Sequence, residues 1–337
     1  MQVDPGFVIE LSESEREHVR NLSNSVGSME QVNDELLNRI EVVSLQLPHR
    51  VVSNLIAFKR SSNNYGMLLL RGLPIDVQLP LTPTTAQIGT VPDITTSKIV
   101  LLLHMLLIGE PIGYEDEQNG ELFHHVYPIK GCEHRIENSG SKVFFDYHTE
   151  DAIHPFRPDH LALLCLRNDH DETAETRVSC ISKALQVISP HAINILRKNL
   201  FELKAPSSFG KPLSIRTPVL TESLLLPRVL FDYATMKGVT EEAQWALEQL
   251  NRAFNECSIS VKLKPGDLAI IDNRIATHAR TTFEPRYDGR DRWLLRLYTV
   301  VDAFASRQVR WNHEHICAPI SITLTSSTLN SIQLSET

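Results

Sequence analysis

The sequence predicts a mainly β protein with surrounding helices, of the sandwich or jelly-roll type. After about residue 120 it contains many short runs rich in β-branched and aromatic residues, separated by turn residues. It contains no G-x-G-x-x-G or G-K-[ST] phosphate loop, and short strands of this kind favour the predicted class over a doubly wound parallel sheet. We expect strands over residues 142–150, 160–166, 228–232, 258–263, 267–272 and 293–301.

Helices are expected before and between these strands. Ser12 and Glu15, three residues apart, form a capping-box pattern at which a helix should begin. The apolar stretch 99–108 predicts a buried helix, because it is about half as long as the roughly 20 residues that cross a bilayer. Apolar periodicity predicts further helices over 32–43 and 51–56, from residue 190 and over 240–257, and a buried strand over 65–70.

Composition limits the possible partners and the compartment. The 337 residues include 33 Lys plus Arg and 41 Asp plus Glu, a formal net charge of −8. Without a long basic block, this charge argues against nucleic acid or a membrane surface as a partner. The N-terminal residues show no secretory signal, and the five cysteines are scattered without a C-x-x-C pair. We therefore expect a cytoplasmic protein with reduced thiols, whose oligomeric state the sequence does not indicate.

His148 and Glu150 lie two residues apart in the expected strand 142–150. Successive side chains of a strand alternate between its faces, so both can contact one metal ion. An H-x-E pair alone is more often a surface salt bridge. A third ligand is therefore needed to predict a metal site.

His278 is the candidate for that third ligand, because it follows the expected strand 267–272 after a short turn. Two histidines and one carboxylate form the facial triad of non-heme Fe(II) enzymes, which leaves positions open for a cosubstrate and oxygen. Arg292 and Arg296, four residues apart, can each bind a carboxylate through a planar fork of N–H groups. The alternatives are a core histidine at His278 and a core-edge arginine at Arg296.

Three segments around these residues carry a resemblance: 148–160, which begins His-Thr-Glu-Asp, 265–280, which ends Ile-Ala-Thr-His-Ala-Arg, and 283–296, which ends Arg-Trp-Leu-Leu-Arg. They resemble the clavaminate synthase-like branch of the Fe(II)/2-oxoglutarate-dependent oxygenases. Within it they are most similar to the free amino-acid hydroxylases, namely viomycin-pathway arginine hydroxylase, asparagine oxygenase and lysine hydroxylases. The likeness runs from about residue 65 to about residue 310, and H-x-E instead of H-x-D is typical of this branch.

The resemblance implies a double-stranded β-helix, or jelly-roll, core and a metal site. His148, Glu150 and His278 would be the ligands of Fe(II). Arg292, assisted by Thr176, would bind the distal carboxylate of the cosubstrate 2-oxoglutarate. O2 would be the second cosubstrate, and succinate and CO2 the coproducts.

The resemblance also implies a site for a small amino-acid substrate. Arg296 would bind the α-carboxylate, Glu150 would accept from the α-amino group, and Gln118 would contact the substrate unless it is a surface residue. Asp232, unless it is an ordinary turn residue, would favour a basic or hydrogen-bond-donating side chain such as that of lysine, arginine, citrulline or ornithine. Leu230 stands where arginine hydroxylases have a second acid, which disfavours arginine because a half-paired guanidinium is costly in a dry pocket.

The implied reaction is hydroxylation of a free L-amino acid at the β or γ carbon. Desaturation or another oxidation on the same scaffold is an alternative, as is a facial-triad metal hydrolase or a carboxylate-binding jelly roll without oxygenase activity. Glu150 argues against halogenation, because halogenating relatives replace this carboxylate by a small residue. We expect one domain over residues 1–337, with a helical scaffold over about 1–110, a jelly-roll core over about 111–310 and a tail over about 320–337.

Overall fold

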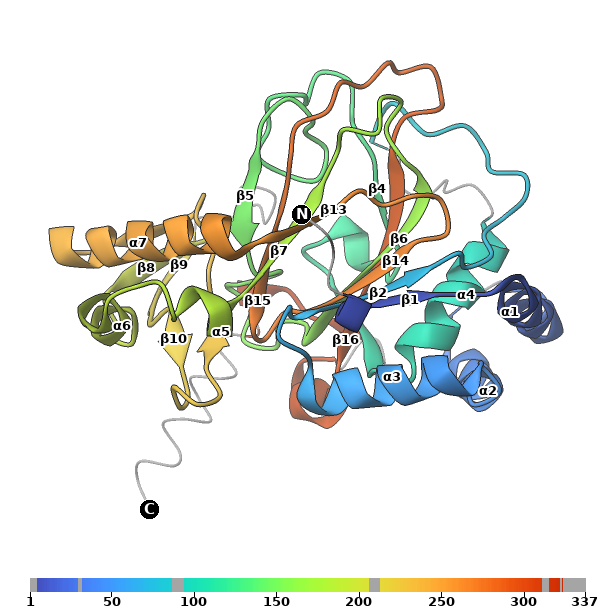
Figure 1. Ribbon diagram of the computed structural model, residues 1–337, viewed down its shortest axis with the longest axis horizontal. Helices are drawn as coiled ribbons and strands as arrows, with labels where there is room; N and C mark the ends of the chain where they lie inside the picture. The colour runs from blue at the N-terminus through green and yellow to red at the C-terminus, as the bar shows by residue number, and fades with distance from the viewer. Residues whose placement is uncertain are drawn as a thin grey trace.

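Two β-sheets that pack face to face form the centre of the protein, as the computed structural model shows (Figure 1). The structure describes residues 5–29, 32–86, 94–205, 213–310, 315–321 and 323. Within these residues the larger sheet has eight strands, in the order β1-β2-β14-β6-β16-β3-β17, with β4 also paired to β16. Their bounds are Val8–Glu10 (β1), Met67–Arg71 (β2), Leu268–Asp272 (β14), His160–Arg167 (β6), Trp293–Val300 (β16), Glu110–Tyr114 (β3), Ile316–Cys317 (β17) and His124–Val126 (β4).

The smaller sheet is antiparallel and has four strands in the described part of the chain, in the order β13-β7-β15-β5. They are Ile259–Val261 (β13), Thr176–Cys180 (β7), Ala276–Arg280 (β15) and Phe145–His148 (β5). Short strands form two further antiparallel units: Met236–Gly238 (β12), Phe201–Lys204 (β8) and Ser214–Thr217 (β9), and Leu220–Thr221 (β10) with Arg228–Val229 (β11).

Side chains of the larger sheet alternate between two apolar cores. In β14, Ala269 and Ile271 point into the core between the sheets, where they join Ala276 of β15. Leu268 and Ile270 point to the opposite face and pack with the N-terminal helices. Because successive strand residues face opposite ways and both faces are buried, this strand is a continuous hydrophobic run.

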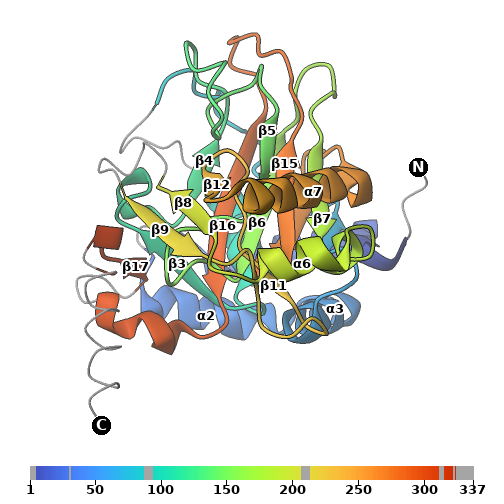
Figure 2. The same cartoon turned by 90° about the vertical axis from the view of Figure 1, so that its left-hand side faces the viewer.

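Helices cover the outer faces of both sheets (Figures 1 and 2). On the larger sheet they are Glu13–Val26 (α1), Asp34–Ser44 (α2), His49–Ser61 (α3) and Thr95–Met105 (α4). On the smaller sheet they are Ile181–Ala184 (α5), Pro190–Leu196 (α6) and Glu241–Cys257 (α7). Short 3-10 helices span Pro5–Phe7 (η1), Gln118–Gly120 (η2) and Ala303–Val309 (η4).

The predicted helix start at Ser12 is confirmed. Glu15 N donates to Ser12 Oγ at 3.3 Å, and Ser12 N donates to Glu15 Oε2 at 2.8 Å, which completes the capping box of α1. Pro48 precedes α3 and separates it from α2, as its inability to continue a helix predicts. The apolar stretch predicted as a buried helix is α4, whose residues from Ile99 onward are buried.

Three expected strands are shorter in the structure: 142–150 is β5, 258–263 is β13 and 228–232 is β11. The strand expected over 228–232 ends at Val229, because the chain then turns at Asp232. The buried strand expected over 65–70 is confirmed as β2, which pairs with β1 and β14 in the larger sheet. The tail expected over about 320–337 lies outside the described residues, except for residues 320, 321 and 323.

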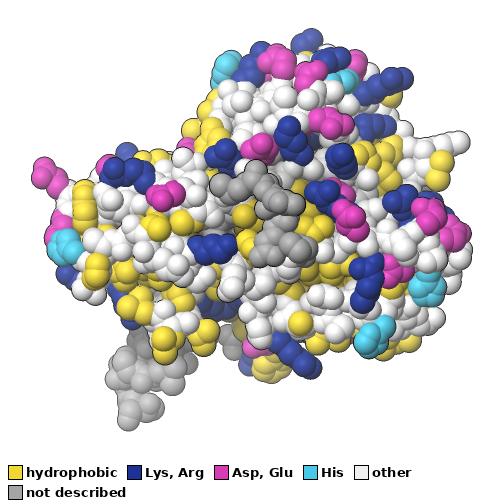
Figure 3. Space-filling model, in the orientation of Figure 1, with side chains coloured by type: hydrophobic (Ala, Val, Ile, Leu, Met, Phe, Trp, Pro, Cys, Tyr) yellow, Lys and Arg dark blue, Asp and Glu magenta, His cyan; other side chains and the backbone are white. Residues whose placement is uncertain are grey.

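The surface has mixed charge on the face drawn in Figure 3, where basic and acidic side chains are interspersed. Among the described helices, none combines the length and the apolar character needed for a membrane crossing.

Candidate active site

The three candidate metal ligands converge between the two sheets. His148 ends β5, Glu150 follows two residues later, and His278 lies in the middle of β15, where the antiparallel register places it opposite His148. One ligand atom from each residue lies within 4.8 Å of those of the other two, and all three residues are buried. The structure thus brings together the three residues that the sequence singled out.

Asn273, in the turn before β15, fixes the backbone that carries Glu150. Glu150 N donates to Asn273 Oδ1 at 2.7 Å, and Asn273 Nδ2 donates to the carbonyl oxygens of Glu150 and Pro158 at 3.0 and 2.8 Å. Asn273 is fully buried, so these bonds are shielded from water. The segment with Glu150 is therefore tied to the strand that carries His278.

The protonation states suit a metal ion. His148 Nδ1 lies 2.7 Å from the carbonyl oxygen of Asp146, so Nδ1 donates and Nε2 keeps its lone pair. Burial and the neighbouring His278 lower the pKa of His148 to about 4, so the ring is neutral near pH 7. Burial opposes ionisation of Glu150, but Arg296 and His278 outweigh it and hold the pKa of this carboxyl well below its usual range. Two imidazoles and one carboxylate at this spacing fit the facial triad of Fe(II).

Arg296, on β16 of the larger sheet, reaches the triad from the opposite side. Its Nη1 donates to Glu150 Oε1 at 2.7 Å, and its Nη2 donates to Glu117 Oε2 at 3.1 Å and to His124 Nδ1. His124 can accept this bond because its Nε2 donates to the carbonyl oxygen of Glu121. Burial would lower the pKa of Arg296, but the charge of Glu150 more than offsets it and raises the pKa.

Tyr298 and Glu117 complete this cluster, and the sequence interpretation named neither. Tyr298 lies two residues after Arg296 on the same strand face, and its hydroxyl donates to Glu150 Oε1 at 2.6 Å. The same hydroxyl lies 3.2 Å from Glu117 Oε2. Burial and the charge of Glu117 raise the pKa of the Asp151 carboxyl well above its usual value.

Gln118 is not placed in this cluster. It begins η2 with a positive φ of 43°, and its side chain is exposed. The preceding residue, Glu117, instead points toward Arg296 and Tyr298. Glu117 therefore occupies the position beside the cluster in which residue 118 was expected. A substrate contact by Gln118 stays a prediction.

A narrow cavity extends from the triad between the sheets and contains Arg292. Arg292 immediately precedes β16, is buried, and makes no hydrogen bond or ion pair with another described residue. Its guanidinium lies 5.8 Å from the ring centroid of Phe283, and burial lowers its pKa. Thr176, at the start of β7, is buried and lines the same cavity. Both residues lie where a carboxylate ligand near the triad could meet them.

Arg280 lines this cavity too, although the sequence interpretation did not include it. It is buried on β15, two residues after His278, and its strand partner on β7 is Thr176. Burial and the nearby Arg292 lower its pKa to about 9. The cavity therefore contains two guanidinium groups close enough to repel each other.

Asp232 lies beside His148, with which its backbone forms an isolated antiparallel bridge. Its Oδ1 accepts from the backbone N–H groups of Ala234 and Thr235 at 3.0 and 3.2 Å, so the residue does stabilise a local turn. It does not line the narrow cavity. Burial and the charge of Asp232 raise the pKa of the half-buried Asp146, so two carboxyl groups lie close together at this edge of β5.

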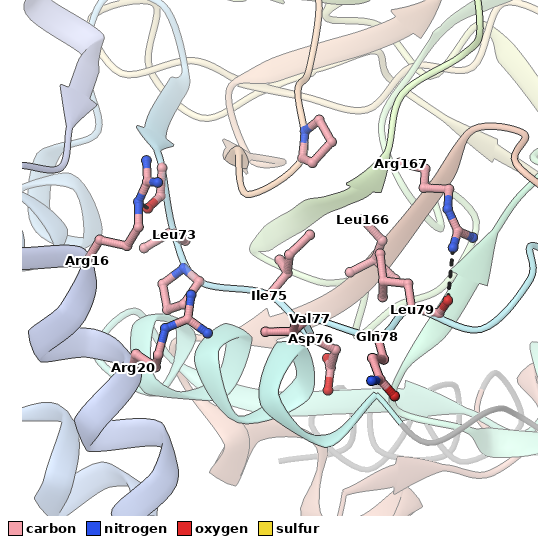
Figure 4. A pocket seen from close by; sticks show the side chains of 13 residues that line it. Arg16, Arg20, Leu73, Ile75, Asp76, Val77, Gln78, Leu79, Leu166 and Arg167 are labelled. Atoms are coloured by element: carbon pink, nitrogen blue, oxygen red, sulfur yellow. Dashed lines mark hydrogen bonds between the residues drawn. The ribbon is translucent and has the colours of Figure 1, made fainter. Parts of the chain in front are cut away.

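A larger open groove, of about 900 Å³, lies along α1 and the segment that follows β2 (Figure 4). None of its lining residues lines the triad cavity. Two of its three lining arginines bind the backbone: Arg16 Nε donates to the carbonyl oxygen of Gly72 at 2.8 Å, and Arg167 Nη2 to that of Leu79 at 3.1 Å. The third, Arg20, pairs with Glu17. The arginines of this groove bind other parts of the chain and stabilise the fold. The candidate active site is therefore the smaller cavity at the triad.

A buried facial triad between two sheets, with unpaired arginines beside it, is the arrangement of a metal-dependent oxygenase. The chain belongs to the taurine catabolism dioxygenase TauD, TfdA family, whose sequence model matches residues 41–298. This family assignment agrees with the resemblance found in the sequence.

Curated relatives include amino-acid oxygenases. L-asparagine oxygenase of Streptomyces coelicolor is 37% identical over 266 residues, which cover 78% of this chain and 79% of that protein. Clavaminate synthase 2 of Streptomyces clavuligerus is 32% identical over 280 residues, 79% of this chain and 83% of that one. L-lysine 3-hydroxylase of Catenulispora acidiphila is 32% identical over 278 residues, 80% of this chain and 77% of that one.

Solved structures match over nearly the whole chain. Asparagine oxygenase in complex with Fe(II), 2S,3S-3-hydroxyasparagine and succinate has a TM-score of 0.88 and 32% identity, covering 93% of this chain and 99% of that one. The non-heme iron oxygenase OrfP in complex with Fe and alpha-ketoglutaric acid has a TM-score of 0.81 and 28% identity, covering 93% of this chain and 99% of that one.

Proposed function

We propose that this protein is an Fe(II)/2-oxoglutarate-dependent hydroxylase of a free L-amino acid. The observation that carries the proposal is the presence of two separate buried arginines beside the triad. Arg292 faces the cavity without a hydrogen-bond or ion-pair partner among the described residues, and Arg296 reaches Glu150 from the other side. A 2-oxo diacid and an amino acid each bring a carboxylate that a guanidinium binds through two parallel hydrogen bonds. A facial-triad hydrolase would leave these arginines without a task.

His148, Glu150 and His278 are the proposed ligands of Fe(II). The bound metal supplies the oxygen chemistry of the family, in which 2-oxoglutarate becomes succinate and CO2 and one oxygen atom enters the substrate. Arg292 and the hydroxyl of Thr176 are proposed to hold the distal carboxylate of 2-oxoglutarate. Solved relatives that contain iron with succinate or alpha-ketoglutaric acid support 2-oxoglutarate as the cosubstrate.

The cluster around Arg296 is proposed to bind the head group of the amino acid. Arg296 would take the α-carboxylate, and Glu150 Oε1 would accept from the α-ammonium group. Glu117 adds a second carboxylate on the same side, 3.1 Å from Arg296 Nη2. Holding both head-group charges fixes the position of the side chain, so the carbon attacked, which we propose is β or γ, depends on its distance from the head.

The substrate side chain is proposed to extend past His148 toward Asp232. A carboxylate at that end favours a side chain that donates hydrogen bonds or carries positive charge, such as that of lysine, ornithine, citrulline or arginine. The amide of asparagine is also a donor, and relatives named for asparagine and lysine fit this class. Asp232 keeps one oxygen for this purpose, because the two turn hydrogen bonds use only Oδ1.

We further propose that the two facing sheets are the double-stranded β-helix core and that residues 1–337 form one oxygenase domain. The pairing of β2, from the N-terminal hundred residues, with β14 supports one domain because both strands are needed for one sheet. The five cysteines are free, which agrees with the proposed cytoplasmic location.

A screen of the common amino acids with Fe(II), 2-oxoglutarate and ascorbate tests the activity. We expect one or a few amino acids to give a product heavier by one oxygen atom, with an equal amount of succinate. The His148→Ala variant is the control and should show no turnover. Absence of substrate-stimulated succinate with every amino acid would contradict the proposal, and a product lighter by two hydrogens would replace hydroxylation by desaturation.

A further inference from the structure

The proposed function assigns no role to Arg280, a buried cation that lines the cavity. Arg280 is 7% exposed, and its Nε is buried without a hydrogen-bond partner among the described residues. The hydrogen bond found for its guanidinium runs from Nη2 to the carbonyl oxygen of Val143 and is long, at 3.5 Å. Most of the five N–H donors of an arginine are therefore unused here.

No described carboxylate lies within ion-pair distance of Arg280 or Arg292. Neither Arg280 nor Arg292 forms an ion pair with any residue in the described ranges, although both are buried and line the same cavity. Burying a charge is costly unless it is paired, and two like charges side by side add to that cost. The arrangement is therefore incomplete until an anion binds.

The aromatic contacts of Arg280 do not replace a counter-ion. Its guanidinium lies 5.8 Å from the ring centroid of Phe145 and 5.4 Å from that of Phe283. Ring faces attract a cation, but they accept none of its N–H groups in the way that an oxygen does. Phe283 also lies 5.8 Å from the guanidinium of Arg292, so this ring contacts both arginines and leaves their donors for a ligand.

We propose that Arg280 is a second binding residue for the distal carboxylate of 2-oxoglutarate, which it holds together with Arg292. This inference rests on the proposed function. Arg280 and His278 lie two residues apart on one strand face, about 6.6 Å along the strand. This is the right scale for a five-carbon diacid whose 2-oxo end lies at the triad and whose far end lies at the arginines.

Two cations at the far end make the distal carboxylate a strict requirement. A 2-oxo acid of the same length without this carboxylate leaves both guanidinium groups buried and unpaired. We therefore expect 2-oxopentanoate to bind far more weakly than 2-oxoglutarate, although both can chelate a metal through the 2-oxo acid group.

Calorimetric titration of the anaerobic Fe(II)-loaded protein with each of these two acids tests the inference without turnover. Arg280→Gln should weaken the binding of 2-oxoglutarate by about 30-fold or more, as expected when one partner of a buried charge pair is lost. Its affinity for 2-oxopentanoate should stay within about twofold of the wild type. Arg280→Lys keeps the charge, so its affinity for 2-oxoglutarate should lie between that of the wild type and that of Arg280→Gln. This intermediate value guards against a folding defect in the glutamine variant.

Arg177→Gln is the matched control. Arg177 lies on the neighbouring strand β7 and pairs with Glu175 and Asn255, away from the cavity lining, so its replacement should change neither affinity. An equal loss of affinity for both acids in Arg280→Gln, or no loss for either, would overturn the inference while leaving the proposed function in place. Failure of the wild-type protein to bind 2-oxoglutarate would overturn both.

Discussion

Arg296 and Glu150 are hydrogen-bonded to each other at 2.7 Å, so the proposed substrate anchor is paired with a proposed metal ligand. An amino acid is a zwitterion and can exchange with this pair, its carboxylate going to Arg296 and its ammonium group to Glu150. Both buried charges then have a partner before and after binding, which avoids the cost of an unpaired charge.

Replacing Arg296 by lysine should separate substrate binding from cosubstrate binding. Lysine keeps the charge but loses the planar fork that binds a carboxylate through two N–H groups. We expect KM for the amino acid to rise by about 30-fold or more, with the affinity for 2-oxoglutarate changed less than about threefold. Steady-state kinetics with each ligand varied in turn measure this, and an equal effect on both ligands would contradict the assignment.

Replacing Asn273 by alanine should weaken the metal site from a distance. The variant loses three buried hydrogen bonds, at about 1 kcal/mol each, so the free energy of unfolding should fall by about 3 kcal/mol. Because Glu150 is no longer held, iron affinity should fall by about 10- to 100-fold. Urea denaturation and iron titration measure the two effects. Asn54→Ala, which removes an exposed hydrogen bond on α3, is the control and should change neither.

Glu117→Gln tests which residue contacts the head group. Glutamine can still accept from Arg296 and Tyr298 but has no charge, so binding of an α-ammonium group should weaken by about tenfold. Binding of the α-hydroxy acid analogue of the substrate should change little. Gln118→Ala should leave both unchanged because this side chain is exposed. The opposite pattern would restore residue 118 as the contact.

Asp232 can be tested with a pair of substitutions. Asn at this position keeps an oxygen acceptor for the turn N–H groups of Ala234 and Thr235 but removes the charge, whereas Ala removes both. With a cationic substrate, Asp232→Asn should lower kcat/KM by about tenfold or more, and the effect on a neutral substrate should be much smaller. Equal losses for both kinds of substrate would remove the proposed role and leave Asp232 as a turn residue.

Acid should destabilise the metal-free protein through its buried histidines. Burial lowers the pKa of His104 on α4 from 6.5 to about 4, so between these pH values the unfolded chain binds more protons than the folded one. The free energy of unfolding should therefore fall as pH decreases through this window. Urea denaturation of His104→Leu should show a pH dependence that is shallower by up to about one proton. Parallel pH profiles for variant and wild type would contradict the shift.

The sequence placed the proposed metal ligands well because their pattern is local. Strand alternation predicted that His148 and Glu150 lie close together, although β5 ends at His148 and Glu150 is held in the following turn by Asn273. The same rule places Arg280 beside His278 and Tyr298 beside Arg296. Applied to every strand, this rule would have found Arg280 and Tyr298, but not Glu117, which lies outside a strand. The expected strands 160–166, 267–272 and 293–301 were confirmed as β6, β14 and β16. Each is a continuous apolar run, which is typical of a strand buried on both faces.

Other features depend on contacts that a linear pattern does not contain. Glu117 faces the cluster while Gln118 is exposed, and Gln118 has a left-handed backbone that a linear pattern does not predict for a non-glycine residue. The unpaired state of Arg280 becomes visible only when Thr176, Arg292 and Phe283 surround it. Strand β11 is shorter than expected because the turn at Asp232 interrupts pairing after Val229.

The pairing of β14 with β2 has a consequence for how the protein acquires its metal. Met67 lies opposite Ile271, so this ladder joins segments separated by roughly 200 residues, and such long-range pairing makes folding slow. His278 lies on β15, the strand after β14, and its partner His148 lies far earlier in the sequence, on β5. The three proposed ligands come together only when distant segments pair, so a truncated chain that lacks β5 or β15 cannot form the proposed metal site.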